Sequence, residues 1–353
     1  MFSLSKGEVV GVDIGHYYTK VVDIVDKKGV FVLKHAFKEF TPQDVITSEG
    51  VDEIVLGDFL KSIFSQHGVK SRSVAVALSS SFVITKTLTM PLVADEEVDQ
   101  AVMWEAEQYA PVSMEDVNVS YQILDKNEEK NEMTVLLALT KKEIVDTYIK
   151  AFNRAKLKVK IVDVDVFSIY NAYEINNKDA LNKHIAFVDM GYSSTKLLFV
   201  KKGVPIFSRY MDFNFASLIN EAVDVLSLKK EEIGILLSKK QQDEKKESLI
   251  NFLNDKLIAL YTQIQNSVTF YMNNILSVEE PIEEVVLVGV LGSLYENLNI
   301  EIMQEFFKSD ITRFNPFDVV SKEGSGESID ETTPDISPFY CIASGLALRS
   351  VAK

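Results

Sequence analysis

The sequence is poor in the residues that build covalent and metal-bound frameworks. Its 353 residues include one cysteine, Cys341, and four histidines. A single cysteine excludes an internal disulfide bond, and a zinc site, which usually takes four cysteine or histidine ligands, is not expected. No signal peptide is recognisable at the start of the sequence. Together these absences predict a cytoplasmic protein.

Long apolar runs and excess positive charge are missing as well. No stretch approaches the roughly 20 apolar residues that a helix needs to cross a bilayer. Lys and Arg number 37 against 52 Asp and Glu, which gives a net charge of −15. This acidity argues against a nucleic-acid-binding protein. It also disfavours direct contact with anionic lipid, so any attachment to a membrane is expected to use a protein partner.

One short pattern occurs twice in the chain. Residues 11–20 read GVDIGHYYTK and residues 187–196 read FVDMGYSSTK. Each copy follows an apolar strand and precedes another. The two aspartates, Asp13 and Asp189, are 176 residues apart, about half the chain. A repeat on this scale predicts two similar halves, and the length alone favours two domains or more.

The chemistry of the repeated pattern suits a phosphate site. A tight turn through Asp-x-Gly exposes backbone N–H groups that bind anions, and hydroxyl groups add hydrogen bonds. An aspartate beside a phosphate is suited to hold Mg²⁺ or its water, which predicts Mg²⁺ at Asp13 and Asp189. The alternative is a pair of ordinary hairpin turns. The residues expected to contact phosphate are Gly15, Thr19, Lys20, Gly191, Ser193, Ser194 and Thr195.

Hydrophobic periodicity predicts alternating strands and helices, hence an α/β fold. Glycines at 289 and 292 follow a predicted strand and precede a predicted helix over 294–298, so Gly289 and Gly292 are expected to line an adenosine site. The predicted strands cover 9–13, 19–25, 30–37, 74–78, 83–90, 118–124, 133–139, 159–164, 184–188, 197–200 and 282–288. The predicted helices cover 51–67, 95–109, 141–155, 165–173, 216–225, 249–276 and 339–351.

These features resemble the actin/Hsp70/sugar-kinase superfamily and, within it, the PilM family, the FtsA-like cytoplasmic proteins of type IV pilus assembly. Residues 96–111, EEVDQAVMWEAEQYAP, are similar to that family's acidic W-E-A-E-Q-Y-x-P helix. The resemblance covers essentially the whole chain. Further matching segments lie at 117–124, 162–165, 270–271, 315–317 and 345–349.

The resemblance implies an actin-like ATPase fold with two lobes around a nucleotide cleft. Subdomain 1A would comprise 1–81 together with 159–183 and 336–353. An FtsA-type subdomain 1C would be inserted over 82–158, and domain 2 (2A/2B) would cover 184–335.

The same resemblance implies a scaffold with ATP and Mg²⁺ as ligands and at most slow ATPase activity. Asp165 would orient the attacking water. The scaffold would bind the short cytoplasmic N-terminal peptide of a PilN-like membrane protein between 1A and 1C, and would be peripheral to the inner membrane through that partner. Other pilus assembly components are implied, and self-association is left open. The peptide groove is expected to include Trp104, Tyr109, Glu105 and Glu107.

Several alternatives stay open at this stage. His16-Tyr17-Tyr18 replaces the small hydroxyl residues of the family's first loop, which allows a pseudo-ATPase adaptor without nucleotide. Asp165 suits a helix N-cap as well as catalysis, and Trp104 suits the core of the insert as well as a groove. A sugar-kinase-like phosphotransferase, an FtsA-like division protein and a related secretion machine are the other candidates. The division protein should carry a C-terminal amphipathic membrane helix, whereas this sequence ends at Lys353.

Overall fold

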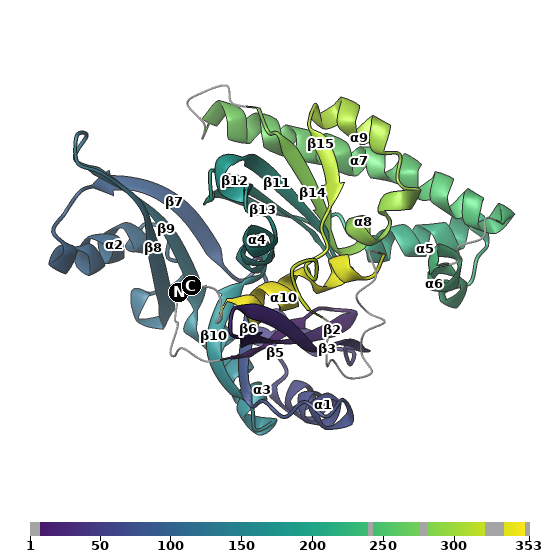
Figure 1. The fold of residues 1–353 in the computed structure, drawn as a ribbon, viewed down its shortest axis with the longest axis horizontal. Coiled ribbons are helices and arrows are strands. Elements are labelled where there is room, and N and C mark those ends of the chain that lie inside the picture. Colours follow the sequence, from purple (N-terminus) through teal and green to yellow (C-terminus); the bar gives the residue numbers. More distant parts are fainter. Residues whose placement is uncertain (1–7, 239–242, 275–280, 322–334, 350–353) are drawn as a thin grey trace.

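The computed structural model describes residues 8–238, 243–274, 281–321 and 335–349. They form two lobes, each built on a five-stranded sheet, with a smaller three-stranded module at one side (Figure 1). Within these ranges, no helix combines the length and the apolar character that a membrane span requires.

The first lobe contains the earlier copy of the repeat. Its sheet has the order β10-β6-β1-β2-β3, in which the first three sequential strands form an antiparallel meander and β6 and β10 run parallel to β1. The predicted strands of this lobe are confirmed. Their bounds are β1 (Val10–Ile14), β2 (Tyr18–Lys27), β3 (Val30–Phe40), β6 (Ser73–Leu78) and β10 (Lys158–Val164).

The second lobe has the same strand arrangement, built around the later copy of the repeat. Its sheet has the order β13-β12-β11-β14-β15, again with an antiparallel meander followed by two parallel strands. The match of strand order and direction confirms the prediction of two similar halves. The bounds are β11 (His184–Met190), β12 (Thr195–Lys201), β13 (Val204–Met211), β14 (Glu284–Val288) and β15 (Asp310–Arg313).

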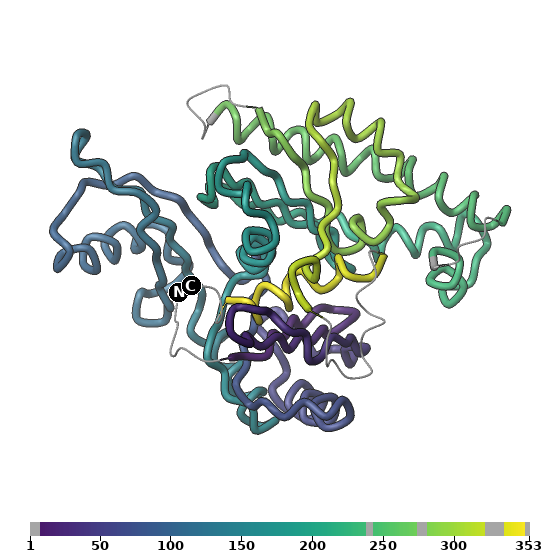
Figure 2. The backbone as a smooth tube through the Cα atoms, viewed as in Figure 1, coloured from purple at the N-terminus to yellow at the C-terminus, as the bar shows by residue number. Residues whose placement is uncertain are grey.

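Two helices lie between the sheets. α4 (Asp165–Asn176) and α10 (Cys341–Leu348) pack on each other, α10 on β1 and β2, and α4 on β10 and β12 (Figures 1 and 2). Nearly every side chain of α10 is buried, because the helix has sheet or helix on all sides. The predicted terminal helix is present as α10, preceded by a 3₁₀ helix over Ser337–Tyr340, and its predicted end at 350–351 lies outside the described residues.

The first lobe's outer face is covered by α1 (Glu53–Gln66) and α3 (Lys142–Arg154), which pack on each other. The carboxylate of Asp52 caps α1 by accepting hydrogen bonds from the backbone N–H groups of residues 54 and 55. The predicted start of this helix at residue 51 is therefore wrong by two residues. Gly50–Val51 instead forms β5, which pairs with β4 (Ile46–Thr47).

A further group of helices belongs to the second lobe. The glycine turn differs from the prediction, because the helix begins at Gly289 itself and Tyr295–Asn297 forms only a 3₁₀ turn. The predicted long helix begins at Glu244, five residues earlier than expected, and its end beyond residue 274 lies outside the described residues. The bounds are α5 (Phe215–Leu226), α6 (Lys230–Ser238), α7 (Glu244–Asn274), α8 (Gly289–Ser293) and α9 (Ile300–Phe307).

The three-stranded module has a core of its own. Its strands are β7 (Ile84–Pro91), β8 (Val117–Asn127) and β9 (Glu132–Lys141), in the order β7-β9-β8, and α2 (Val98–Glu107) covers one face. The helix α3 follows the module in sequence, yet its buried side chains belong to the core of the first lobe. The limits proposed for an inserted subdomain, 82–158, stay a prediction.

The module also touches the second lobe. The hydroxyl groups of Thr85 and Ser208 lie 2.8 Å apart, and the hydroxyl of Thr87 donates a 3.0 Å hydrogen bond to the carbonyl of Pro205. These contacts join β7 to β13, so the module lies against both lobes.

The crossing of α10 and α4 depends on glycine. A methyl group added at Gly345 would lie 1.7 Å from the carbonyl oxygen of Ser168 in α4, and one added at Gly11 would lie 1.9 Å from the carbonyl oxygen of Ala343. Both contacts are with backbone atoms that cannot rotate away. The small residues of the terminal helix thus allow its close approach to α4 and β1.

We predict that Gly345→Ala destabilises the protein by about 1–3 kcal/mol or more, because the added methyl must push α10 away from α4. Urea unfolding measures this change. Gly234→Ala in α6 is the matched control, since no atom lies within 4 Å of the added methyl. That variant should be neutral or stabilising by up to about 1 kcal/mol, as alanine favours helix. Equal effects of the two substitutions would contradict the packing argument.

Candidate functional site

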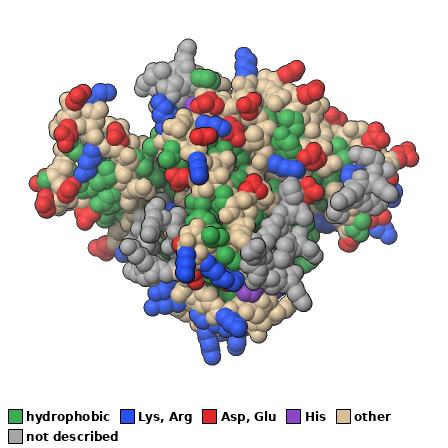
Figure 3. All heavy atoms as spheres, in the orientation of Figure 1, with side chains coloured by type: hydrophobic (Ala, Val, Ile, Leu, Met, Phe, Trp, Pro, Cys, Tyr) green, Lys and Arg blue, Asp and Glu red, His purple; other side chains and the backbone are tan. Residues whose placement is uncertain are grey.

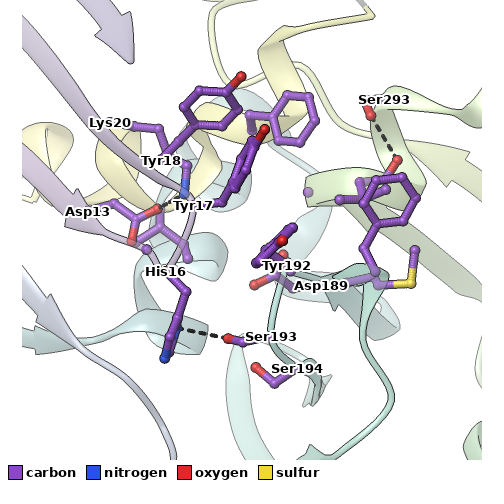
Figure 4. Close-up of a pocket in the computed structure, with 18 of the residues that line it drawn as sticks. Asp13, His16, Tyr17, Tyr18, Lys20, Asp189, Tyr192, Ser193, Ser194 and Ser293 are labelled. Carbon is purple, nitrogen blue, oxygen red and sulfur yellow. Dashed lines mark hydrogen bonds and ion pairs between the residues drawn. The ribbon is translucent and has the colours of Figure 1, made fainter. Parts of the chain in front are cut away.

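A large cavity lies between the lobes where the two copies of the repeat face each other (Figure 4). Its volume is about 1400 Å³, and both repeat loops, α6 and α8 contribute to its lining. Apolar walls with a few convergent polar groups are typical of small-molecule sites.

Each lobe places an aspartate directly opposite a lysine on the neighbouring strand. In the antiparallel registers, Asp13 pairs with Lys20 and Asp189 with Lys196. The Lys20 Nζ lies 2.8 Å from Oδ2 of Asp13, and the Lys196 Nζ lies 3.4 Å from Oδ2 of Asp189. The repeat therefore encodes an ion pair in each lobe, since both lysines follow their aspartates by seven residues.

Lys196 makes a further ion pair that crosses between the lobes. Its Nζ lies 2.9 Å from Oδ2 of Asp165, the first residue of α4. The side chain of Lys196 is only 13% exposed. Burial by itself would lower the pKa of this lysine, but the carboxylates of Asp165 and Asp189 raise it above its ordinary value, so the ammonium group stays charged. Burial raises the pKa of Asp189, and Lys196 opposes that effect.

The two loops also touch each other directly. The Nδ1 of His16 lies 2.8 Å from the Oγ of Ser193, and the rings of Tyr17 and Tyr192 are stacked with centroids 4.6 Å apart (Figure 4). Burial, and secondarily the charge of Lys196, lowers the pKa of His16. A neutral imidazole is therefore favoured beside Ser193.

The predicted phosphate residues divide into two groups. Gly15, Lys20, Gly191, Ser193 and Ser194 line the cavity. The other two, Thr19 and Thr195, are fully buried and do not line it. The Thr19 hydroxyl bonds with that of Thr41, and the Thr195 hydroxyl donates to the carbonyl of Phe213, so both residues hold the loops in place.

The two glycines of the predicted adenosine turn also differ, because only one of them lines the cavity. Gly289 lines the cavity with φ of +60°, and a methyl group there would lie 2.5 Å from Oδ1 of Asp189. Gly292 does not line the cavity. A methyl group at Gly292 would lie 2.6 Å from the carbonyl oxygen of Leu287, so this glycine allows close packing of α8.

The carboxylates do not fit the predicted Mg²⁺ at Asp189. An ammonium group already lies between Asp165 and Asp189, where it neutralises these carboxylates and would repel a divalent ion placed beside them. Lys20 has the same relation to Asp13. Within the described ranges, no group of three or more carboxylate, histidine or cysteine side chains is arranged to hold a metal ion.

Asp165 lines the cavity, but its carboxylate is fully engaged. It accepts hydrogen bonds from the backbone N–H groups of Ser80 and Val166 as well as the ion pair from Lys196. The N-cap position of α4 belongs to Val164 rather than to Asp165. A role for Asp165 in orienting water stays a prediction, and its observed contacts position the start of α4.

A second, smaller cavity of about 300 Å³ lies between the module and the first lobe. The free face of the module's sheet, with Ser120 and Ala138, forms one side, and α3 and β10 form the other. In the described part of the chain, β8 and β10 each pair with one strand only, so both are edge strands. The Oγ of Ser120 is enclosed and makes no hydrogen bond to any described residue.

The residues predicted to form a peptide groove lie elsewhere in the module. Trp104 is 69% exposed on α2, which excludes a role in the module's core. Side chains alternate between the two faces of a strand, and α2 packs on the face opposite to the second cavity. None of Trp104, Glu105, Glu107 and Tyr109 lines that cavity.

Tyr192 and Lys196 are among the residues of the large cavity for which the sequence predicted no role. For Lys196 the signal was present, because it stands at the same place in the second copy as Lys20 in the first. For Tyr192 there was none, since its stacking partner, Tyr17, is remote in sequence.

Comparison with known proteins identifies relatives across the whole length. The family model described as "Type IV pilus assembly protein PilM" matches residues 11–351. A structure titled "PilM-PilN type IV pilus biogenesis complex" is similar with a TM-score of 0.83 and 21% identity over 99% of this chain and 100% of the other. The ethanolamine utilization protein EutJ from Carboxydothermus hydrogenoformans is similar with a TM-score of 0.54 and 13% identity, over 98% and 91%. The predicted actin-like, two-lobed α/β fold is confirmed.

We predict that the stacked rings stabilise the closed contact between the loops. Tyr17→Leu and Tyr192→Leu should each lower the free energy of unfolding, and the double variant should lose less than their sum by about 0.5–1.5 kcal/mol. Chemical unfolding of the four proteins measures this coupling. The pair Tyr17→Leu and Tyr295→Leu is the control and should be additive, because these rings make no contact. A coupling of zero between Tyr17 and Tyr192 would contradict the prediction.

Proposed function

The chain belongs to the PilM family of type IV pilus assembly proteins, and from this premise we propose that it is a scaffold that binds a membrane partner's peptide and uses ATP as a conformational ligand. The partner would be a PilN-like protein, and the ligand site would be the short cytoplasmic N-terminal segment of that protein. Through it the scaffold would be held at the cytoplasmic side of the inner membrane. Other assembly components would contact its remaining surface.

The observation that carries the peptide site is the second cavity, which lies between two edge strands. An extended peptide binds such a place by adding main-chain hydrogen bonds and burying alternate side chains. The walls offer apolar contacts from Leu136, Val145 and Val162, and the unpaired hydroxyl of Ser120 offers a polar one. Burying a hydroxyl without a partner is unfavourable, so a peptide group that bonds to it gains affinity.

This placement refines the predicted groove. The cavity lies between the proposed subdomains 1A and 1C, as the family resemblance implied, but its walls are β8, β10 and α3 rather than the Trp104 helix. The structure of a PilM–PilN complex with a similar fold supports a PilN-like partner for this chain. The exposed α2 face, with Trp104, is left for contact with another component.

The large cavity supports ATP as the second ligand. It has room for a nucleotide, and Ser193 and Ser194 offer hydroxyl groups to the phosphates. Lys20, which pairs with Asp13, offers a positive charge. A phosphate tail between the loops must separate the Tyr17–Tyr192 stack and the His16–Ser193 hydrogen bond. Binding would therefore change how the lobes are held. At most slow turnover is expected, because Asp165 is engaged on all sides.

An adaptor without nucleotide is the second candidate. The observation that favours it is that the loops already hold each other through side-chain contacts, so a ligand is not required to join the lobes. The sugar-kinase and division-protein alternatives gain no support from the family match.

For the peptide site, we predict that Ala138→Glu lowers the affinity for a PilN-like N-terminal peptide about tenfold or more, because it introduces an unpaired charge into the groove. Ser120→Ala should weaken binding to a smaller extent. Trp104→Ala is the matched control and should bind normally, since α2 lies on the other face of the sheet. Fluorescence anisotropy of a labelled peptide measures all three. Loss of binding in Trp104→Ala alone would move the site to α2.

For the cleft, we predict measurable heat of ATP binding by calorimetry and a rise in the unfolding temperature. Lys20→Met should weaken the affinity about tenfold by removing a cation that faces the phosphates. Lys183→Met is the control, because Lys183 pairs with Glu284 and does not line the cavity. If millimolar ATP gives neither heat nor a thermal shift, the adaptor without nucleotide is the correct function.

A further inference from the structure

The strongest unexplained feature of the cleft is its buried ammonium group. Lys196 lies 2.9 Å from a carboxylate oxygen of Asp165 and 3.4 Å from one of Asp189. Both carboxylates face the cavity between the repeat loops, and their side chains are 4% and 9% exposed. A cation coordinated by two buried carboxylates at this place is what a nucleotide-bound divalent metal would otherwise supply.

We propose that Lys196 is a built-in cation that takes the place of Mg²⁺, so that the cleft rejects divalent metal and binds its nucleotide in the metal-free form. The second half of this statement rests on the proposed nucleotide site. The first half concerns the protein without any ligand and can be tested separately.

The charges in the cleft support this inference. Three carboxylates, those of Asp13, Asp165 and Asp189, are matched by two ammonium groups, Lys20 and Lys196, each at ion-pair distance. His16, the nearest titratable neighbour on the first loop, faces Ser193 and adds no negative charge. Within this cluster only one negative charge is left over, and among the other charged residues that line the cavity Lys38, Lys230 and Lys246 outnumber Glu296 and Asp335, which leaves too little negative charge to bind a divalent ion strongly.

The contacts of Asp165 fix this arrangement. Its two oxygens accept hydrogen bonds from the backbone N–H groups of Ser80 and Val166, which hold the carboxylate in the orientation that meets Lys196. Asp189 is held against Gly289, where a larger residue would not fit. Since the carboxylates cannot turn away easily, a metal ion could enter only by displacing the ammonium group.

The decisive experiment uses Mn²⁺, a spectroscopic substitute for Mg²⁺, and measures its binding to the nucleotide-free protein by electron paramagnetic resonance. The unaltered chain should bind no Mn²⁺ at millimolar concentration. Lys196→Met should gain a Mn²⁺ site, because it leaves two buried carboxylates without a cation. Lys196→Arg keeps the charge and should gain none, and Lys183→Met, an ion-pair variant outside the cleft, should also gain none.

Mn²⁺ bound tightly by the unaltered chain would overturn the proposal, and this measurement does not depend on how Lys196→Met folds. A folded Lys196→Met that gains no Mn²⁺ would overturn it as well. Calorimetry with ATP then tests the second half. The affinity in the presence of a chelator should equal or exceed that with Mg²⁺, whereas a gain of about tenfold from Mg²⁺ would contradict it. Absence of any ATP binding would refute the nucleotide site while the Mn²⁺ result still decides the role of Lys196.

Discussion

A buried ion pair joins the two lobes inside the cleft, beside the packing of α4 on β12 and the ring contacts of Tyr170 and Tyr173 with Phe187. The Lys196 ammonium on β12 of the second lobe meets the Asp165 carboxylate at the start of α4 in the first. Removing one member of a buried ion pair is strongly destabilising, because the other charge remains without compensation. The pair therefore holds the lobes together at this point, and the contacts of Tyr17 with Tyr192 and of His16 with Ser193 add to it across the cleft. The side chains of the protein itself therefore hold the two lobes together across this cleft.

The sequence predicted the fold well because its strongest signals are local. Apolar strands that flank Asp-x-Gly turns define β1, β2, β11 and β12, and their repetition predicts two lobes of one design. Helix ends were less accurate, since they depend on neighbours. Asp52 caps α1 and leaves residues 50 and 51 to a strand, and Gly289 starts α8 because only glycine fits beside Asp189.

The sites were predicted less completely, since the direction of a side chain is a tertiary property. Thr19 and Thr195 lie on β2 and β12 next to the repeat loops, but both are buried away from the large cavity, and Gly292 allows the close packing of α8. The residues expected in the groove lie on the face of the module's sheet opposite to the second cavity, and the groove itself stays a proposal. The acidic helix with Trp104 is a clear pattern in sequence, yet which face of the sheet it covers is decided by the alternation along β8 and β9.

The hydrogen bonds between β7 and β13 have a thermodynamic consequence. Thr85 bonds to Ser208 and Thr87 bonds to Pro205, so the module is held against the second lobe. The same module forms one side of the proposed groove, and the first lobe forms the other side. The second cavity and the large cavity are thus bounded by parts that touch one another, which offers a route for coupling between ligands bound in the two places. For equilibrium binding such coupling is reciprocal. If a ligand in the cleft changed affinity at the proposed groove by some factor, a peptide in the groove would change affinity in the cleft by the same factor.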